Sequence, residues 1–575
     1  MTLPRNEYPR PQMVRNQWVN LNGKWDFEFD FSKSGQEREF YKNGNFTKEI
    51  IVPFCPESSL SGIGFTDFIP ACWYKRSIDI TQEQIKKVAL LHFGAVDYKC
   101  VVYVNGNMAG THVGGYSSFC MDISAHLSVG ENTLVVYAED DVRSGKQPRG
   151  KQSGHYHSQG CDYTRTTGIW QTVWLEFVPQ SYIASYKVFP DLNNGTVDIT
   201  VKLAGDTNGM EVVACAFFEN KPMGAVTTTT NGTSASIRLS LAESHPWDAG
   251  VPNLYDLVIN LRAGDEIVDS VTGYFGLRSI YLKDSAIYLN NRPLFQRLVL
   301  DQGFYPDGIY TAPTDEALKK DIELSMALGF NGARLHERVF EERFLYHADK
   351  LGYLVWSEQG NWGLDHTVPE ALHYFLPEWL EIVERDFNHP SIVGWCPFNE
   401  TWDVNGKKQY DETLRIVYLA TKALDPTRPV IDTSGNFHVA TDIYDVHDYD
   451  QDVESFAKKY KHLKKGEAHE TFPDKQKHEG QPYFVSEYGG AWWGKGSDGW
   501  GYGKSPLAED EFVARYVGLT DALLSSEGVC AFCYTQLYDI EQEQNGLYTY
   551  DRQRKFSDET YAKIREVNTR MAAIE

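Results

Sequence analysis

TDEALKKDIELSMALGFNGARLH (residues 314–336) contains the two patterns that decide the fold of this chain. Its first part starts at Thr314, has acidic residues in the next turn and ends at Gly329, which predicts a capped helix. The short apolar run that follows and ends at His336 is typical of a buried strand. Helix-like and strand-like segments alternate in this way between residues 277 and 575, which favours a (β/α)8 barrel, the TIM barrel fold. The other helices expected here cover residues 340–352, 370–387, 412–424 and 510–524.

The part of the chain before residue 277 predicts strands and no helix of useful length. Short stretches of alternating polar and apolar residues are separated by turn signals such as Asn22-Gly23 and Asn105-Gly106. Residues 1–180 therefore predict one β-sandwich, and residues 181–276 predict an immunoglobulin-like β-sandwich. We expect three domains, 1–180, 181–276 and 277–575.

The composition excludes some classes of partner. The chain has 575 residues and a formal net charge of −24, and so acidic a surface repels phosphate backbones, which argues against nucleic acid. No run approaches the ~20 apolar residues that span a bilayer, and the first residues have no apolar signal core, so we expect a cytoplasmic protein that does not enter a membrane. The nine cysteines are scattered, and Cys530 and Cys533 lie in an apolar run typical of a buried strand rather than of a redox or metal site.

The residues that end the apolar runs of the predicted barrel carry its chemistry, because barrel active sites lie at the carboxyl ends of the strands. Two of these residues, Glu400 and Glu487, follow runs that would bury their backbones. A buried carboxylate without a function is costly, and two facing one barrel mouth are typical of glycoside hydrolysis. Other runs end at Asp301, His336, Glu358, Asn399, Tyr449 and Gln536.

Two motifs make the resemblance to a family specific. NHPSIVGWCPFNE (388–400) and FVSEYGG (484–490) resemble the acid/base and nucleophile segments of glycoside hydrolase family 2, and the similarity extends over essentially the whole chain. The resemblance implies a jelly-roll, sugar-binding-like sandwich before the immunoglobulin-like sandwich and the catalytic barrel. It also implies a retaining exo-β-glycosidase that binds a carbohydrate substrate and needs no metal or cofactor, with Glu400 as general acid/base and Glu487 as nucleophile. Many relatives form oligomers, so a homo-oligomer is also expected.

The same resemblance implies roles for further residues. Asn399 would bind the sugar 2-hydroxyl, Tyr449 would contact the nucleophile, and His336 would lie near the substrate. Asp162, six residues before Gly168, matches the aspartate by which the first sandwich reaches the barrel mouth and makes relatives exo-acting. An alternative for Asp162 is an ion pair with Arg165. The other candidate substrate-binding residues are Glu358, Trp402, Phe532, Glu543 and Asn545, and sugar platforms are also considered for Trp356, Trp362, Trp492 and Trp493.

Alternatives remain for two acids and for the sugar. Glu358 and Asp301 could bind hydroxyls or pair with Arg334 and Arg297, respectively. Relatives that cleave β-glucuronides carry Asn-x-Lys where this chain has residues 543–545, Glu-Gln-Asn, so a uronate is disfavoured.

Relatives that cleave β-galactosides often have Trp at the position of Phe532, and the magnesium ligands of their large members are absent. The first expectation is a β-galactoside, and the alternative is a β-glucuronide or β-galacturonide. A non-catalytic carbohydrate-binding protein on the same scaffold is the alternative of another class.

Overall fold

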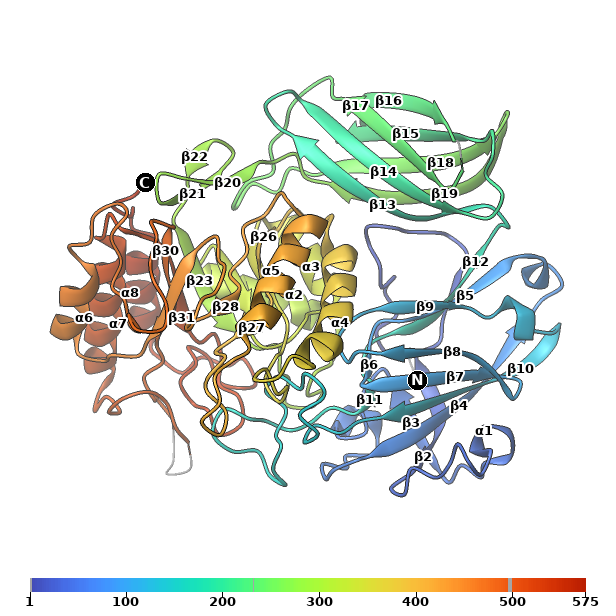
Figure 1. Cartoon of the computed structure of the whole chain (residues 1–575), viewed down its shortest axis with the longest axis horizontal. Coiled ribbons are helices and arrows are strands. Elements are labelled where there is room, and N and C mark those ends of the chain that lie inside the picture. The colour runs from blue at the N-terminus through green and yellow to red at the C-terminus, as the bar shows by residue number, and fades with distance from the viewer. Residues whose placement is uncertain (1–2, 231, 495–498) are drawn as a thin grey trace.

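The computed structural model describes residues 3–230, 232–494 and 499–575, and Figure 1 shows three regions in chain order. Two β-sandwiches lie beside a barrel of parallel strands and helices, so the predicted fold class is confirmed. No helix in these described ranges is both long and apolar enough to cross a membrane.

The first sandwich packs a four-stranded sheet, β1-β12-β5-β9, against a six-stranded sheet, β3-β2-β4-β10-β7-β8. Its core is apolar, and the predicted turn at Asn105-Gly106 joins β7 to β8 with both residues at positive φ. The strands are β1 Trp18–Asn20, β2 Gly23–Phe29, β3 Lys48–Val52, β4 Ala71–Ile80, β5 Val88–Phe93, β6 Val96–Asp97, β7 Lys99–Val104, β8 Asn107–Val113, β9 Phe119–Asp122, β10 Gly130–Glu139, β11 Gly168–Ile169 and β12 Val173–Val178. A single turn of helix, α1 (Phe40–Asn43), accompanies them.

The second sandwich has the alternation expected of antiparallel sheets with one buried face. In β17 (Ser234–Ser240), for example, buried and exposed residues alternate along the whole strand. Its sheets have the orders β13-β14-β17 and β16-β15-β18-β19. The other strands are β13 Tyr182–Asp191, β14 Thr196–Ala204, β15 Glu211–Phe218, β16 Lys221–Thr229, β18 Tyr255–Ala263 and β19 Glu266–Phe275.

The barrel follows a small sheet of β20 (Ile280–Lys283), β21 (Ala286–Leu289) and β22 (Arg292–Pro293). Seven parallel strands have the order β26-β25-β24-β23-β31-β30-β29, and the short parallel pair β27-β28 stands between β26 and β29 in chain order. The strands are β23 Gln296–Asp301, β24 Gly332–Leu335, β25 Leu354–Glu358, β26 Ile392–Cys396, β27 Phe398–Asn399, β28 Thr433–Ser434, β29 Tyr444–Asp448, β30 Tyr483–Gly489 and β31 Val529–Thr535.

The five predicted barrel helices are present. In α2 (Asp315–Ala327) the Thr314 side chain accepts a hydrogen bond from the backbone of Ala317, so the predicted cap is confirmed. The others are α3 Glu342–Leu351, α4 Ala371–Asp386, α5 Asp411–Leu424 and α7 Glu509–Leu524.

The structure adds α6 (Val453–Tyr460) and α8 (Asp558–Asn568), which the sequence analysis missed. In the described chain no helix follows β28, so residues 435–443 lead directly to β29.

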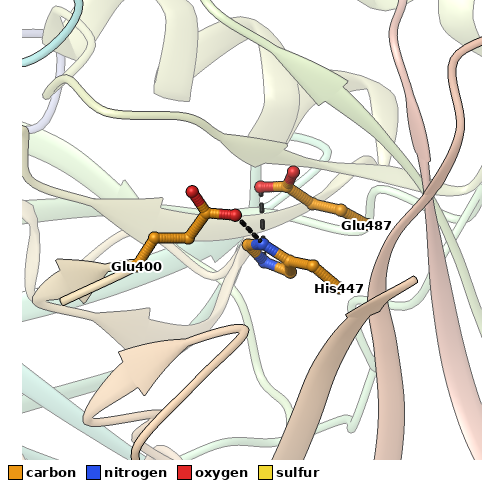
Figure 2. Close-up of side chains that lie close together, drawn as sticks. All are labelled: Glu400, His447 and Glu487. Carbon is orange, nitrogen blue, oxygen red and sulfur yellow. Dashed lines mark hydrogen bonds and ion pairs between the residues drawn. The ribbon is translucent and has the colours of Figure 1, made fainter. Parts of the chain in front are cut away.

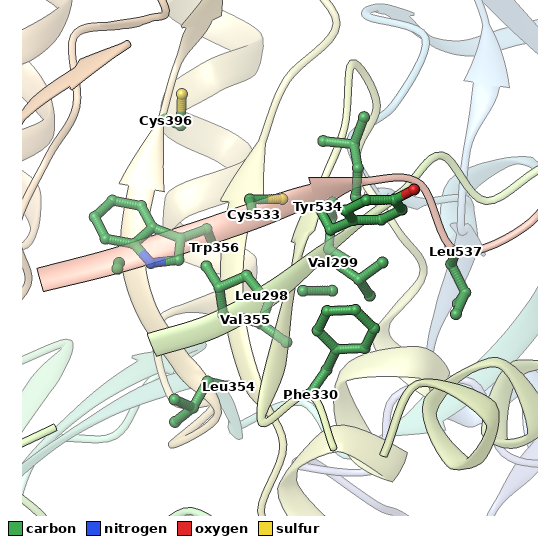
Figure 3. Close-up of a cluster of buried hydrophobic side chains, with 14 of the residues drawn as sticks. Leu298, Val299, Phe330, Leu354, Val355, Trp356, Cys396, Cys533, Tyr534 and Leu537 are labelled. Atoms are coloured by element: carbon green, nitrogen blue, oxygen red, sulfur yellow. The ribbon is translucent and has the colours of Figure 1, made fainter. Parts of the chain in front are cut away.

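The barrel interior is filled with apolar side chains, which Figure 3 shows around Val355 and Trp356. The Trp356 ring needs a glycine beside it, because a Cβ at Gly394 would lie 2.3 Å from one of its ring carbons. Cys530 and Cys533 are free and buried in β31, as their apolar run predicted. The packed interior makes the barrel a rigid support for the side chains at its strand ends.

Candidate active site

Glu400 and Glu487 face one another across His447 at the carboxyl ends of their strands (Figure 2). Glu400 directly follows β27, Glu487 lies in β30, and His447 lies in β29. The imidazole Nδ1 is 2.6 Å from Oε1 of Glu400, and Nε2 is 3.3 Å from Oε1 of Glu487. One oxygen of each carboxylate and a nitrogen of His447 lie within 4.8 Å of one another. The two predicted catalytic carboxylates therefore meet at one point of the barrel mouth.

Glu487 is held as an anion. Its Oε1 accepts a hydrogen bond from Nη1 of Arg334 at 2.8 Å, and its Oε2 accepts one from the hydroxyl of Tyr449. Burial alone would raise the pKa of this carboxyl, but the charges of His447 and Arg334 outweigh it and hold the pKa below its usual range. The predicted contact between Tyr449 and Glu487 is confirmed. An ionised, anchored carboxylate is the form that a nucleophile requires.

Glu400 has its backbone in the left-handed region, with φ at 45°, which is uncommon for a residue other than glycine. Its Oε2 accepts a hydrogen bond from the indole N–H of Trp402 at 3.1 Å, so Trp402 reaches the site as predicted. Burial raises the pKa of Glu400, but the hydrogen bond and charge of His447 dominate and lower the pKa to about 2. In the free protein the proton of this pair therefore resides on the imidazole.

The sequence analysis missed His447. Burial lowers its pKa, but the carboxylates of Glu487 and Glu400 raise it above its ordinary value, so the ring is a cation between two anions. Side chains two residues apart lie on the same face of a strand, and this spacing from Tyr449 was the signal that could have identified it. Among the described residues, Glu400, His447 and Glu487 form a group with metal-ligand spacing.

Arg334 is hydrogen-bonded to three residues of the site. Its guanidinium donates to Glu358 at 2.7 Å, to Glu487 at 2.8 Å and to Oδ1 of Asn399 at 2.6 Å. Glu358 is fully buried and also accepts a hydrogen bond from the backbone N–H of Glu337, so its alternative role as the partner of Arg334 is the one observed. The Nδ2 of Asn399 is buried without a hydrogen-bond partner in the described parts of the chain. It is therefore a donor that remains available to a ligand.

His336 lies at the same mouth. Its Nδ1 is 3.1 Å from Oε1 of Glu358 and 3.8 Å from Oε1 of Glu487. Burial and the charge of Lys151 lower its pKa well below the ordinary value, so this imidazole is neutral. A neutral ring beside the nucleophile can accept or donate a hydrogen bond without competing for the Glu487 charge.

A loop of the first sandwich, residues 149–165, lies across the barrel mouth; we call it the sandwich loop. The backbone N–H of Arg149 donates to the carbonyl of Trp362 at 2.8 Å. Toward the other side, the Gln542 side chain donates to the carbonyl of Asp162 at 3.0 Å. On the same loop, the Nζ of Lys151 lies 3.7 Å from the centre of the Trp362 ring. The loop thus joins the segments that follow two barrel strands, β25 and β31.

Asp162 reaches the mouth, but its carboxylate is paired. Both of its oxygens accept hydrogen bonds from Arg149 at 3.2 Å. The expected alternative partner was wrong, because Arg165 instead donates to backbone carbonyls such as that of Ser153. A substrate hydroxyl bound by Asp162 would have to share this carboxylate with Arg149.

Glu543 and Asn545 lie beneath the sandwich loop. Glu543 is buried and accepts hydrogen bonds from the Tyr163 hydroxyl and, at 2.9 Å, from Nδ2 of Asn545. Burial raises the pKa of Glu543, although the charge of Lys151 opposes the shift. Both carboxylate oxygens of Glu543 are therefore already hydrogen-bonded within the protein.

Several other expectations are corrected by packing. Phe532 is fully buried in β31, where its ring packs edge-on against Phe295, so it does not lie beneath a sugar. Trp356 is in the barrel core, and Trp493 packs against Phe512 and Phe556. Side chains on a barrel strand point alternately to the barrel interior and to the surrounding helices, and sequence alone did not identify which interior residues reach the mouth.

Asp301 is not paired with Arg297. It accepts hydrogen bonds from the Tyr538 hydroxyl at 2.5 Å and from the Gly303 backbone at 3.0 Å, whereas Arg297 is bound to Glu575. Trp362 remains at the mouth, where its indole N–H donates to the carbonyl of Asn399 at 3.3 Å. Trp492 is partly buried, and its Nε1 has no partner in the described chain.

Comparison with known proteins gives matches along most of the chain. Residues 65–179 match the sugar binding domain of glycosyl hydrolases family 2, residues 181–278 match a second domain of this family, and residues 280–502 match its TIM barrel domain. A β-galactosidase of Thermoanaerobacter pseudethanolicus is 28% identical over 348 residues, 59% of this chain and 46% of that protein. The β-glucuronidase of Felis catus is 25% identical over 481 residues, 74% of this chain and 69% of that protein.

Solved structures give the same picture of the fold. A β-glucuronidase from Ruminococcus gnavus in complex with an N1-substituted uronic isofagomine superposes with a TM-score of 0.81 at 20% identity, covering 98% of this chain and all of that one. The chain spans only 44%, 46% and 41% of the length of three bacterial relatives. Three consecutive family domains and the two carboxylates at the barrel mouth lead to one assignment: the chain belongs to glycoside hydrolase family 2.

Proposed function

We propose that this protein is a retaining exo-β-glycosidase that removes a terminal β-linked sugar, with a β-hexuronide of the glucuronide type as its substrate. The observation that carries the mechanism is the separation of the two carboxylates, which have oxygens within 4.8 Å of one another. Retaining enzymes have carboxyl groups ~5–5.5 Å apart, whereas inverting enzymes leave ~6.5–9.5 Å for a water molecule.

The first chemical step forms a glycosyl-enzyme. A carboxylate oxygen of Glu487 attacks the anomeric carbon while the bond to the leaving oxygen breaks, and Glu400 gives that oxygen a proton. In the free protein His447 holds this proton 2.6 Å from Oε1 of Glu400, so His447 returns it to Glu400 when the substrate covers the site. Arg334 and Tyr449 keep Glu487 oriented for the attack.

The second step hydrolyses the glycosyl-enzyme. Once Glu487 is an ester, it no longer carries the negative charge that raises the pKa of His447. Glu400 is then a carboxylate that takes a proton from a water molecule, and the resulting hydroxide attacks the anomeric carbon and frees Glu487. The sandwich loop across the barrel mouth supports removal of a sugar from a chain end rather than cleavage within a chain.

The similarity to β-glucuronidases supports the choice of sugar, and a neutral β-galactoside is the second candidate, because a β-galactosidase is also among the similar proteins. The test is a panel of 4-nitrophenyl β-glycosides of glucuronate, galacturonate, galactose, glucose and mannose, with the anomer first released followed by proton NMR. We expect the β-anomer first and the highest kcat/KM for a uronide. Release of the α-anomer first would contradict the retaining mechanism, and a preference for galactose would favour the second candidate.

A further inference from the structure

The sandwich loop places an ammonium group at the barrel mouth. Lys151 is only 6% exposed, and its Nζ lies over the Trp362 ring at 3.7 Å. Within residues 3–230, 232–494 and 499–575, no carboxylate oxygen lies within 4.0 Å of this nitrogen, and no hydrogen bond from it is found. The ammonium group therefore has N–H donors from which a ligand carboxylate can accept hydrogen bonds.

The carboxyl groups whose charges act most strongly on Lys151 are those of Glu543, Glu337 and Glu400. Each of these carboxyl groups also interacts with another group of the protein. Glu400 is bound to protonated His447. Glu543 accepts hydrogen bonds from Tyr163 and Asn545, and burial raises its pKa. Burial lowers the pKa of Lys151, but these acids and Cys161 outweigh it and raise the pKa above its ordinary value, so the side chain is an ammonium ion whose N–H donors remain available.

Glu337 is fully buried, and burial raises its pKa well above the ordinary value, so it is a neutral acid. Its Oε2 accepts a hydrogen bond from the backbone N–H of Trp362 at 3.2 Å. This hydrogen bond ties the Trp362 backbone to the Glu337 side chain, and the Trp362 ring in turn lies against the Lys151 ammonium group.

Two barrel cations described at the mouth are already paired, and one of them, His447, lies between the carboxylates of Glu400 and Glu487. Arg334 donates to Glu358, Glu487 and Asn399 and is 1% exposed. The barrel segment 543–545, Glu-Gln-Asn, has no basic residue. Of Arg334, His447 and Lys151, Lys151 alone has no ion pair with a carboxylate of the described chain, so it can serve as the positive partner of a ligand carboxylate.

We propose that Lys151 binds the carboxylate of a hexuronic acid at the barrel mouth, and that it makes the protein selective for β-hexuronides over neutral β-glycosides. This inference rests on the proposed function, because it assigns the sugar that the same catalytic pair would release. The ammonium group would pair with the two carboxylate oxygens of the sugar, and Trp362 would hold the lysine side chain from the opposite side.

The test compares wild type with Lys151→Met, Lys151→Arg and the control Lys146→Met, a change at an exposed lysine near the same loop. The substrates are the 4-nitrophenyl β-glycosides of glucuronate, galacturonate, glucose and galactose, which also separates the two uronates. We expect Lys151→Met to lower kcat/KM for the preferred uronide by about 100-fold, mostly through KM, and to change the neutral glycosides by less than about 3-fold. Lys151→Arg should keep part of the preference, and Lys146→Met should behave as wild type.

Equal losses on uronides and neutral glycosides in Lys151→Met would overturn the inference. If the wild type cleaves neutral glycosides with retention but no uronide, the inference fails and the glycosidase proposal stands. If it cleaves nothing in the panel, the proposed function fails, and calorimetric titration with free glucuronate and galacturonate then decides the role of Lys151. Binding by wild type that is lost in Lys151→Met supports it, and no binding by wild type contradicts it.

Discussion

The barrel strand ends and the sandwich loop both contribute to the site, but in different ways. The barrel contributes charges that are already paired. The Glu487 carboxylate lies 2.8 Å from the Arg334 guanidinium and 3.3 Å from the His447 imidazole. The sandwich loop contributes Lys151, a charge without a protein partner in the described chain. On the two proposals above, the reaction would take place on the rigid barrel, and the choice of sugar would depend on a segment of another domain.

The largest effect is expected on the barrel side, from Glu487→Ala. Removing the nucleophile should lower kcat by about 10³-fold or more, because no other group can form the glycosyl-enzyme. Added azide should restore part of the turnover and release the α-glycosyl azide, since the small anion attacks from the side that the carboxylate occupied. The measurement is nitrophenol release with NMR of the product, and Glu412→Ala, at an exposed position of α5, is the control. Near-normal activity in Glu487→Ala would show that the nucleophile is elsewhere.

A smaller effect is expected from His447→Asn. Without the imidazole, Glu400 would lose its proton partner, and kcat/KM should fall by about 10- to 100-fold. Because the pKa of His447 is raised, the kcat/KM of the wild type should fall only above the pH at which an ordinary histidine loses its proton. In the variant this fall should occur at lower pH. The measurement is kcat/KM against pH, with His462→Asn, at an exposed histidine, as the control. An unchanged profile would assign His447 a structural role only.

The smallest effect is expected from a change at Glu57, near the C-terminal end of the sandwich loop. Glu57 is 3% exposed and accepts a hydrogen bond from the backbone N–H of Thr167 at 3.2 Å. Burial raises the pKa of Glu57 to about 8. Because the folded state binds this proton more tightly than the unfolded state, the stabilisation is full below pH ~4.3 and is lost as pH rises through about 8.

Glu57→Gln should therefore raise Tm by about 2–4 °C at pH 8.5 and have less effect at pH 5. The measurement is thermal unfolding at both pH values, with the exposed Glu412→Gln as control. A similar change in Tm at the two pH values would mean that the ionisation of Glu57 does not limit stability.

The two motifs predicted which carboxylates lie together at the barrel mouth, because active-site side chains of a barrel stand at its strand ends. Glu400, Glu487, Tyr449 and Asn399 follow apolar runs, and the structure brings them together. His447 was missed, although it lies two residues before Tyr449 near the end of β29, because a histidine within a strand carries no signal of its own. Phe532 was misplaced because alternation cannot say which end of a packed barrel an interior ring occupies.

The sequence by itself determined the order of the domains, the barrel and the pair of carboxylates, because periodicity and strand-end chemistry are local properties of the chain. Only the tertiary structure decided which charges are paired and which are available. Asp162 and Arg149, Glu358 and Arg334, and Lys151 over Trp362 are contacts between segments far apart or on loops of irregular conformation. Asp162 and Arg149 lie on one loop, and Glu358 and Arg334 lie on neighbouring barrel strands. The contact of Lys151 with Trp362 depends on how the first sandwich docks on the barrel, and no local pattern encodes that docking.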